Sequence, residues 1–228
     1  MLGKLSSSLQ RRERAWRQSF GKDIVDPRAR RWSVLHYEFV DHAVLRRFWH
    51  NFFEVAPGVY RSNHPNHRRF AAYKAMGIKS VLNLRGTPRR AHHLFEVESC
   101  AALGLALHNT ELHARKPAAR DKLLRLFDLF RSIERPFVMH CKSGADRAGL
   151  ASALYLMAFE DVPVAEARKQ LSIRYLHLKS SKTGVLDHML DLYEARVAEG
   201  PIGIEDWIAT EYDPDAVMAS FQAKRSRR

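Results

Sequence analysis

Two alternating hydrophobic patterns run through the middle of the chain. Short apolar runs predict buried strands, and longer segments with apolar residues three or four positions apart predict helices. The strands expected are two short ones within 54–62, around a Pro57-Gly58 turn, and single ones over 78–84, 105–109 and 137–140. The helices expected cover 41–53, 66–76, 92–103, 117–133, 147–159, 163–175 and 185–198. Strands thus alternate with helices up to residue 140, which predicts an α/β fold with a central, mostly parallel sheet flanked by helices.

The same pattern divides the chain into three parts. Residues 1–53 are expected to form a basic extension that ends in the short helix, residues 54–200 the compact domain, and residues 201–228 a C-terminal extension with a basic tail. Residues 1–31 hold nine basic and three acidic side chains, with aromatic residues interleaved. A solvated, partly disordered arm and a surface helix attracted to anionic lipid both fit this composition.

Charge is the unusual feature of the composition. Of the 228 residues, 38 are Lys or Arg and 25 are Asp or Glu, which gives a net charge of +13. The hydrophobic fraction of 46% is typical of a globular protein. These values exclude a wholly disordered chain, a collagen and a disulfide-rich miniprotein. A basic protein is expected to bind an anionic partner. Because no zinc-ligand cluster or nucleic-acid-binding motif stands out, no nucleic acid is expected among the partners.

The cysteines and the apolar runs indicate where in the cell the protein is expected. Cys100 and Cys141 are too few for a disulfide framework, and a reducing cytoplasm fits them. The longest apolar run, 148–159, is too short to cross a bilayer, and residues 1–20 lack the apolar core of a secretory signal. We therefore expect a cytoplasmic protein, with peripheral contact between its basic N-terminus and an anionic membrane left open.

One short segment combines residues suited to phosphate chemistry. Residues 140–147, His-Cys-Lys-Ser-Gly-Ala-Asp-Arg, lie between a predicted strand and a predicted helix. In such a turn several backbone N–H groups point into one concavity, and the helix N-terminus adds the positive end of its dipole. Gly144 permits the necessary backbone angles, and Arg147 can bind two phosphate oxygens at once. The segment predicts a cradle for a phosphate dianion, formed by Lys142, Ser143, Gly144, Ala145, Asp146 and Arg147.

Cys141 opens this cradle. The amides, the helix dipole and Arg147 all favour a thiolate over a thiol at this position. A thiolate beneath a bound phosphate is placed for in-line attack on phosphorus, which gives a phosphocysteine that water then hydrolyses. A buried structural cysteine next to a helix-capping arginine is the alternative, but Cys, Gly and Arg at this spacing are a demanding coincidence for it.

The segment is identified as the His-Cys-x5-Arg signature of the cysteine-based protein tyrosine and dual-specificity phosphatases. The resemblance extends over about residues 54–198, and the stretches VAPGVYRSNHPN and GIKSVLNLRG resemble the small bacterial and fungal members of the dual-specificity branch. It implies the fold of the cysteine phosphatases, with Cys141 as nucleophile, Arg147 as phosphate clamp and His140 as the residue that orients the loop. It implies neither a metal nor a cofactor.

Two positions depart from the pattern of this family. Ala148 stands where members usually carry a Ser or Thr whose hydroxyl assists breakdown of the phosphoenzyme. The window 109–117, where members usually supply an acidic Asp, contains none. The candidates for the general acid are Asp146, Glu111 and His113. We favour Asp146, because the Asp-Arg ending resembles myotubularin-type lipid phosphatases and mycobacterial secreted phosphatases, although a structural ion pair or helix cap would also account for it.

Basic residues crowd the segment that follows the first predicted strand. Residues 55–95 hold eight Lys or Arg and no Asp or Glu. Arg85 and Arg89 follow a predicted strand, at the sheet edge that carries the phosphate cradle, and Lys179 and Lys182 follow a predicted helix. These four are candidates for the rim of the substrate site.

Together these features favour a phosphomonoesterase that acts on phosphotyrosine or phosphoserine/threonine in proteins. A phosphatase of a polyanionic lipid or lipid-linked sugar phosphate, such as a phosphoinositide or an envelope lipid, is the alternative. A second alternative is a basic, non-enzymatic adaptor that binds anions.

Overall fold

A five-stranded sheet forms the centre of the computed structural model, which describes residues 20–227. The strands run in the order β1-β2-β5-β3-β4, and only β1 is antiparallel to its neighbour. Their bounds are Phe53–Ala56 (β1), Val59–Asn63 (β2), Ser80–Asn83 (β3), Ala106–Asn109 (β4) and Phe137–Cys141 (β5). The predicted α/β fold with a mostly parallel sheet is confirmed.

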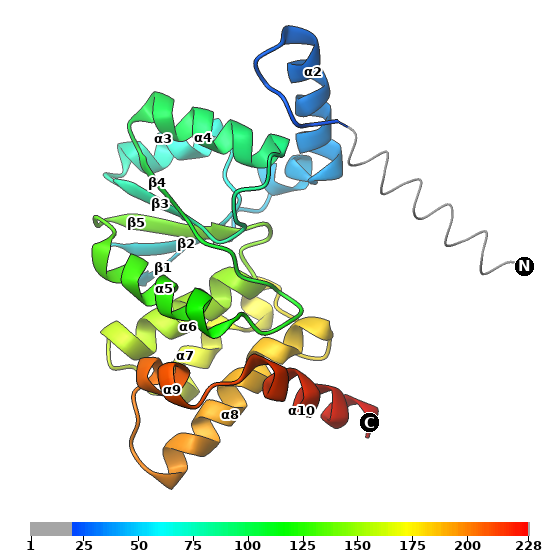
Figure 1. The fold of residues 1–228 in the computed structure, drawn as a ribbon. Coiled ribbons are helices and arrows are strands. Elements are labelled where there is room, and N and C mark those ends of the chain that lie inside the picture. The colour runs from blue at the N-terminus through cyan, green and yellow to red at the C-terminus, as the bar shows by residue number, and fades with distance from the viewer. Residues whose placement is uncertain (1–19, 228) are drawn as a thin grey trace, which may run out of the picture.

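Helices cover both faces of the sheet (Figure 1). α3 and α4 lie on one face, and α5 and α6 lie on the other, with α7 to α10 packed beyond them. α2 projects from the upper end of the molecule. The helices are α2 (Pro27–Leu35), α3 (His67–Ala75), α4 (Ala91–Leu103), α5 (Arg120–Ser132), α6 (Asp146–Phe159), α7 (Val164–Ala167), α8 (Val185–Glu199), α9 (Ile204–Thr210) and α10 (Pro214–Ser226).

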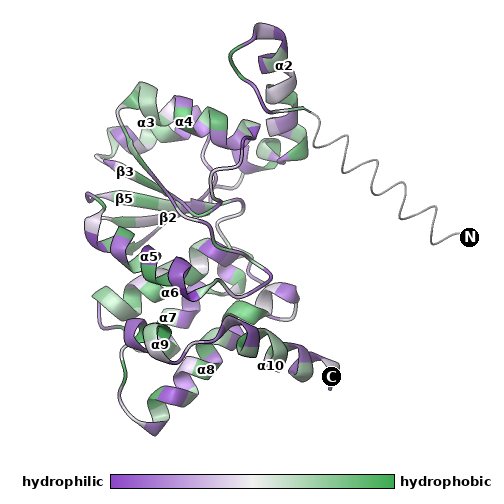
Figure 2. Ribbon diagram, in the orientation of Figure 1, coloured by the Kyte–Doolittle hydropathy of each residue, from purple (hydrophilic) through white to green (hydrophobic). Residues whose placement is uncertain are grey.

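Alternation along β5 directs the residues of the signature to opposite faces. Phe137, Met139 and Cys141 belong to the core shared with α5 and α6, and Val138 belongs to the core shared with α3 and α4. Successive side chains of a strand point to opposite faces, so His140 follows Val138 towards α4. Figure 2 shows apolar strands in the middle of the molecule and polar residues on the outer sides of the helices.

Two predicted helices differ from the structure. In the segment predicted as one helix over 163–175, α7 ends at Ala167 and two 3-10 turns follow, Arg168–Gln170 and Ile173–Tyr175. The backbone oxygen of Gln170 accepts a hydrogen bond from the buried Arg61, which draws the chain out of the helical path. In 41–53, only a 3-10 turn forms, at Ala43–Arg47, before the chain enters β1.

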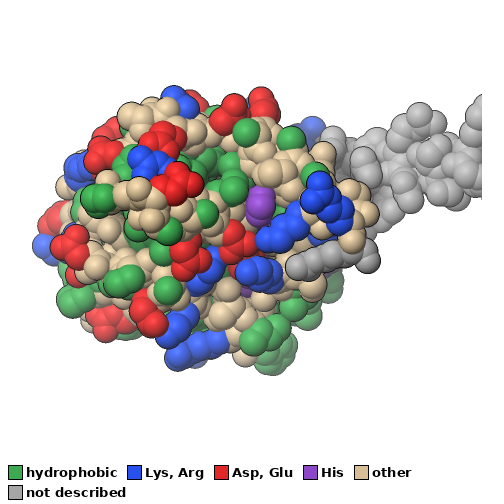
Figure 3. All heavy atoms as spheres, turned by 90° about the horizontal axis from the view of Figure 1, so that it is seen from below, with side chains coloured by type: hydrophobic (Ala, Val, Ile, Leu, Met, Phe, Trp, Pro, Cys, Tyr) green, Lys and Arg blue, Asp and Glu red, His purple; other side chains and the backbone are tan. Residues whose placement is uncertain are grey.

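Both ends of the described chain pack against the sheet domain. Ile204, Trp207 and Tyr212 of the C-terminal segment are buried in the same core as α5 and α6, and Tyr37 packs near Ala91 of α4. The predicted division at residues 53 and 200 stays a prediction. Figure 3 shows acidic and basic side chains intermixed on the face at the α8–α10 end, so the net positive charge is not spread over it as one patch. None of the helices in residues 20–227 has the length and apolar character needed to cross a membrane.

Candidate active site

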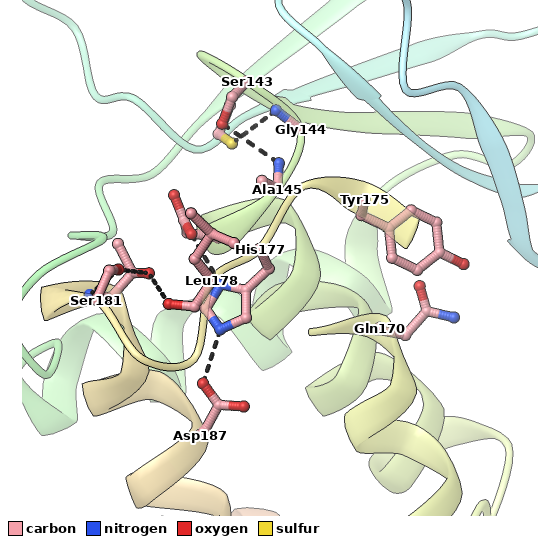
Figure 4. Close-up of polar contacts among 12 residues, drawn as sticks. Ser143, Gly144, Ala145, Gln170, Tyr175, His177, Leu178, Ser181 and Asp187 are labelled. Carbon is pink, nitrogen blue, oxygen red and sulfur yellow. Dashed lines mark hydrogen bonds and ion pairs between the residues drawn. The ribbon is translucent and has the colours of Figure 1, made fainter. Parts of the chain in front are cut away.

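Cys141 ends β5 and begins the loop that leads into α6. Its side chain is 1% exposed, and its sulfur accepts a hydrogen bond from the backbone N–H of Gly144 at 3.3 Å (Figure 4). Hydrogen bonds from backbone amides favour a negatively charged sulfur. The loop therefore curls around the thiol, as the spacing of the signature predicts.

Gly144 and Arg147 complete the cradle. Gly144 has φ +73°, and a Cβ on it would lie 2.7 Å from the backbone nitrogen of Asn63, so only glycine fits at this crossing of two chain segments. The Nε atom of Arg147 is buried and has no hydrogen-bond partner in the described part of the chain. A buried guanidinium donor without a partner is expected to be satisfied by a ligand. Arg147 is therefore ready to bind an anion.

Arg61 of β2 holds this loop from below. Its guanidinium donates to the backbone oxygens of Gly144 (2.6 Å) and Ala145 (3.2 Å) and to the backbone oxygen of Gln170 (2.8 Å). It also lies 3.8 Å from the centroid of the Tyr175 ring (Figure 4 shows Tyr175 and Gln170). Burial lowers the pKa of Arg61 to about 10, so the side chain is still charged at neutral pH. By binding these three carbonyls, Arg61 holds the catalytic loop against the segment that contains Gln170.

Asp146 takes part in a buried chain of three ionisable residues. Its Oδ1 lies 2.8 Å from Nδ1 of His177. On the other side of the ring, Nε2 of His177 lies 2.7 Å from Oδ2 of Asp187 in α8 (Figure 4). Burial alone lowers the pKa of His177, but the hydrogen bonds to Asp146 and Asp187 outweigh it and raise that pKa to about 9. At neutral pH His177 is therefore an imidazolium that donates to both carboxylates.

His140 is anchored behind the loop by Glu96 of α4. Glu96 accepts hydrogen bonds from Nε2 of His140 and, at 3.3 Å, from Nδ1 of His93. Burial raises the pKa of Glu96, but the charge and hydrogen bond of His140, together with His93, lower it to about 2. His64 lies close by, and its potential ligand atom and those of Glu96 and His140 lie within 4.8 Å of one another. Both oxygens of Glu96 already accept hydrogen bonds, whereas Nδ1 of His64 and Nδ1 of His140 are buried without a hydrogen-bond partner in residues 20–227.

A family model describes the part of the chain that contains this loop. It is the model of PTP-SAK, the Swiss Army Knife protein DSP-PTPase phosphatase domain, and it matches residues 55–183. The chain belongs to this family. It is a cysteine-dependent phosphatase of the protein tyrosine and dual-specificity type, as the signature at residues 140–147 predicts.

Solved structures share the fold of this phosphatase at low sequence identity. The DUF442 phosphatase from Shewanella putrefaciens CN-32 is 18% identical with a TM-score of 0.51, covering 63% of this chain and 93% of its own. TpbA of P. aeruginosa is 21% identical with a TM-score of 0.50, covering 65% and 91%. The core catalytic domain of the PP-IP phosphatase SIW14 from S. cerevisiae is 17% identical with a TM-score of 0.50, covering 65% and 91%. No curated protein matches the chain.

The predicted rim residues of the phosphatase are engaged by other parts of the chain. Asp41, which is 6% exposed, accepts two hydrogen bonds from Arg85 (2.6 and 3.1 Å) and lies 3.8 Å from Nζ of Lys142. Burial raises the pKa of Asp41, but Arg85 and Arg46 outweigh it and hold that pKa well below its usual range. Arg89 donates to the backbone oxygen of Lys22. The N-terminal segment thus occupies three of the basic side chains expected around the substrate.

The two other rim candidates lie at the start of α8. Lys179 forms an ion pair with Asp191 of α8 at 3.7 Å. Lys182 opens a 3-10 turn before α8, and its side chain is exposed. Lys179 therefore contacts α8 and not the catalytic loop in the described contacts. The residue of this segment that contacts the loop is His177, through Asp146.

The alternative acids lie on the loop after β4. Glu111 is exposed and forms an isolated antiparallel bridge with Arg85. Burial lowers the pKa of His113, and the charges of Lys116 and Arg147 lower it further, which places His113 within electrostatic range of the phosphate clamp. Both residues therefore remain proposals for proton transfer.

Several residues of the site could not be assigned from the sequence. Arg61 lies far from the signature in the sequence, although a charged residue inside a buried strand is a signal in itself. His177 gave a similar signal, since it interrupts an apolar stretch. Asp41, Glu96 and Asp187 gave none, because their partners lie far away in the sequence.

Proposed function

We propose that this phosphatase hydrolyses phosphomonoesters of phosphotyrosine and phosphoserine/threonine in proteins through a phosphocysteine on Cys141. One observation carries the chemical part of the proposal. The sulfur of Cys141 lies 3.3 Å from the amide of Gly144, in the loop whose clamp, Arg147, has a buried Nε without a partner among residues 20–227. A phosphoryl dianion would accept hydrogen bonds from both groups while its phosphorus faces the sulfur.

The reaction proceeds in two displacements. In the first, an S–P bond forms as the P–O bond to the leaving oxygen breaks, and that oxygen takes a proton or departs as an aryl oxide. In the second, a water oxygen attacks phosphorus, the S–P bond breaks, and Cys141 is released as a thiolate. The proton of the water passes to a base, and inorganic phosphate is the product.

Asp146 is suited to the second displacement. Its Oδ1 accepts a hydrogen bond from the His177 imidazolium at 2.8 Å, which holds the carboxyl group in place next to Arg147. The side chain of Asp146 keeps 21% of its surface exposed, so water can reach it. Ala148 carries no hydroxyl for this step. We therefore assign the removal of the water proton to Asp146. This differs from the sequence-based preference for Asp146 as the general acid, and the donation of a proton to poor leaving groups is assigned to His113 or Glu111 instead.

The ion pairs made by the basic residues expected around the substrate support a phosphoprotein substrate. Asp41 neutralises part of the charge of Arg85 and Lys142, and Asp191 that of Lys179. A phosphate monoester on a side chain needs only the loop and Arg147. A substrate with several phosphates would need free cations around them.

The second candidate is the same chemistry on a phosphate of a lipid. Ile173, Leu176 and Leu178, in the segment that contacts the catalytic loop through His177, expose large parts of their side chains to solvent. Apolar side chains beside a phosphate site suit the acyl chains next to a phosphorylated lipid headgroup. Family membership favours both enzymatic functions over a non-enzymatic adaptor.

Three variants test the mechanism. Cys141→Ser should lose hydrolysis of an aryl phosphate, and wild-type activity in that variant would overturn the proposal. Asp146→Asn should accumulate the phosphocysteine, detected by mass spectrometry after acid quench, with little change in the rate of aryl phosphate cleavage in a single turnover. If His113→Gln slows alkyl but not aryl phosphates, it is the acid of the first step; the same result for Glu111→Gln would assign that residue.

A panel of substrates tests the specificity. Phosphopeptides, phosphoinositides and phosphorylated envelope lipids are compared by released phosphate, with Cys141→Ser as the blank. Preferred hydrolysis of phosphopeptides is expected. Preferred hydrolysis of a lipid would replace the first candidate by the second.

A further inference from the structure

The exposed large apolar side chains of the described chain are concentrated in two segments. Of thirteen such residues, seven lie within 25–48 and three within 173–178. They include Phe48, which is 88% exposed, Phe39 at 63% and Ile173 at 67%. Single exposed apolar residues are ordinary, but a contiguous group marks a surface that binds something.

The helix α2 and the turn after it present apolar side chains to solvent. Trp32 and Leu35 at the end of α2 and Phe39 in the π-helical turn His36–Val40 are all exposed, while Ser33, His36 and Tyr37 between them are buried. In an ordinary amphipathic helix of a globular protein the apolar side chains are buried in the core, whereas here they are exposed to solvent. The fold therefore does not need these side chains for its own core.

Both segments are joined to the catalytic loop by direct contacts. Asp41, which follows Phe39 by two positions, pairs with Arg85 and Lys142. On the other segment His177 pairs with Asp146. Asn51, three positions after the first segment, donates through its Nδ2 to the backbone oxygens of Ser143 in the loop (3.2 Å) and Tyr175 in the second segment (3.0 Å). The exposed apolar side chains thus border the loop that holds Cys141 from two directions, and Figure 4 shows His177 and Leu178 next to it.

Exposed basic residues flank both apolar groups. Arg28 and Arg31 precede Trp32 and Leu35 by one helical turn and are exposed. Arg174, Lys179 and Lys182 are exposed around the second group. Aromatic and aliphatic side chains between arginines and lysines match the interface of an anionic bilayer, where apolar side chains enter the headgroup boundary and basic ones meet lipid phosphates. A second copy of this chain would bring like charges together across a two-fold interface.

We propose that these two segments form a docking face for an anionic membrane, made of Trp32, Leu35, Phe39, Phe48, Ile173 and Leu178. Docking through both segments turns the opening of the catalytic loop towards the lipid surface. Substrates at that surface, whether phosphorylated membrane proteins or lipids, then meet the enzyme in a fixed orientation. The inference concerns binding to the bilayer and stands apart from the choice of phosphoester.

Vesicle binding of the full chain tests the docking face. Sedimentation is compared with vesicles of phosphatidylcholine alone and with vesicles that also contain phosphatidylglycerol. The wild type should bind the anionic vesicles and be released by salt. Trp32→Ser with Phe39→Ser, and separately Ile173→Ser with Leu178→Ser, should each weaken binding by at least about tenfold. Met76→Ser, on an exposed residue directly after α3 and outside both segments, is the matched control and should bind as the wild type does.

Three results would overturn the proposal. The first is a wild type that ignores anionic vesicles or binds neutral ones equally well. The second is wild-type binding by both paired variants, above all if Arg11→Ser with Arg12→Ser abolishes it, because the basic N-terminal arm would then account for the contact. The third is a wild type that self-associates in gel filtration while the paired variants are monomers, which would make the face an interface between copies. Hydrolysis of a water-soluble aryl phosphate by Trp32→Ser with Phe39→Ser confirms that this variant is folded.

Discussion

Nδ1 of His177 lies 2.8 Å from Oδ1 of Asp146, and the other ring nitrogen lies 2.7 Å from Asp187. One buried imidazolium thus connects the residue before the phosphate clamp to α8. The arrangement fixes the start of α6, where the loop must hold its shape, and it holds the Asp146 side chain next to Arg147. His177 acts through Asp146 and is therefore a positioning residue.

His177→Gln should remove a pH-dependent part of the stability. The pKa of His177 is raised from 6.5 to about 9 in the folded protein, so the folded state binds this proton more tightly than the unfolded chain. The stabilisation is complete below pH 6.5 and is lost as the pH rises through about 9. It amounts to at most about 3 kcal/mol. Urea unfolding across this range gives the difference between the wild type and the variant.

A matched control uses an exposed histidine. His67→Gln at the start of α3 should leave the pH dependence of the free energy of unfolding unchanged. Parallel curves for the wild type and His177→Gln would show that the ring does not hold an extra proton in the folded state.

Arg61→Lys should impair catalysis while the charge is kept. Lysine cannot reach the oxygens of Gly144 and Gln170 together, so the carbonyls of the loop lose their common partner. Misplacement of the loop by about 1 Å should lower kcat/KM for an aryl phosphate by about 10²-fold. Arg68→Lys, on an exposed arginine of α3, should have the activity of the wild type. Equal activity of the two variants would contradict the role of Arg61.

Asp41→Asn should shift the preference of the enzyme towards substrates with more charge. The substitution frees Arg85 and Lys142 of their carboxylate, so the KM for a doubly phosphorylated peptide should fall about 3–10-fold relative to that for a singly phosphorylated one. Steady-state kinetics at low and high salt measure the ratio. Glu38→Gln removes a carboxylate from the same segment but one paired with Arg47, and it should leave the ratio unchanged.

Gly144→Ala should be far more damaging than the same change at another glycine with positive φ. Both Gly144 and Gly77 have φ above +70°, but a Cβ at Gly144 would lie 2.7 Å from the backbone of Asn63, whereas at Gly77 nothing lies within 4 Å. Gly77→Ala should therefore cost about 1 kcal/mol of stability and keep its activity. Gly144→Ala should lose most of its phosphatase activity. Similar losses for both variants would mean that backbone angle alone decides the effect.

The fold and the centre of the site could be predicted because their signals are local. Cys141, Gly144 and Arg147 stand in one stretch of eight residues, and a strand before it and a helix after it determine how the amides point. The strands β3 to β5 were found from apolar runs, since a parallel sheet is buried on both faces. The helix expected over 163–175 failed, because a distant contact, Arg61 with Gln170, outweighs local propensity there.

The sequence by itself determined that the chain carries a phosphate loop with a cysteine nucleophile on an α/β fold. Only the tertiary structure decided how the charges around that loop are paired. Asp41 reaches Arg85, and Asp187 reaches Asp146 through His177, although each pair is far apart along the chain. A count of basic residues does not distinguish side chains that are paired from those that are free. In the folded protein a buried carboxylate lies next to basic side chains, because their attraction offsets the cost of removing the carboxylate from water. The net charge of +13 therefore indicates an anionic partner, but the tertiary structure determines which basic residues remain available to bind it.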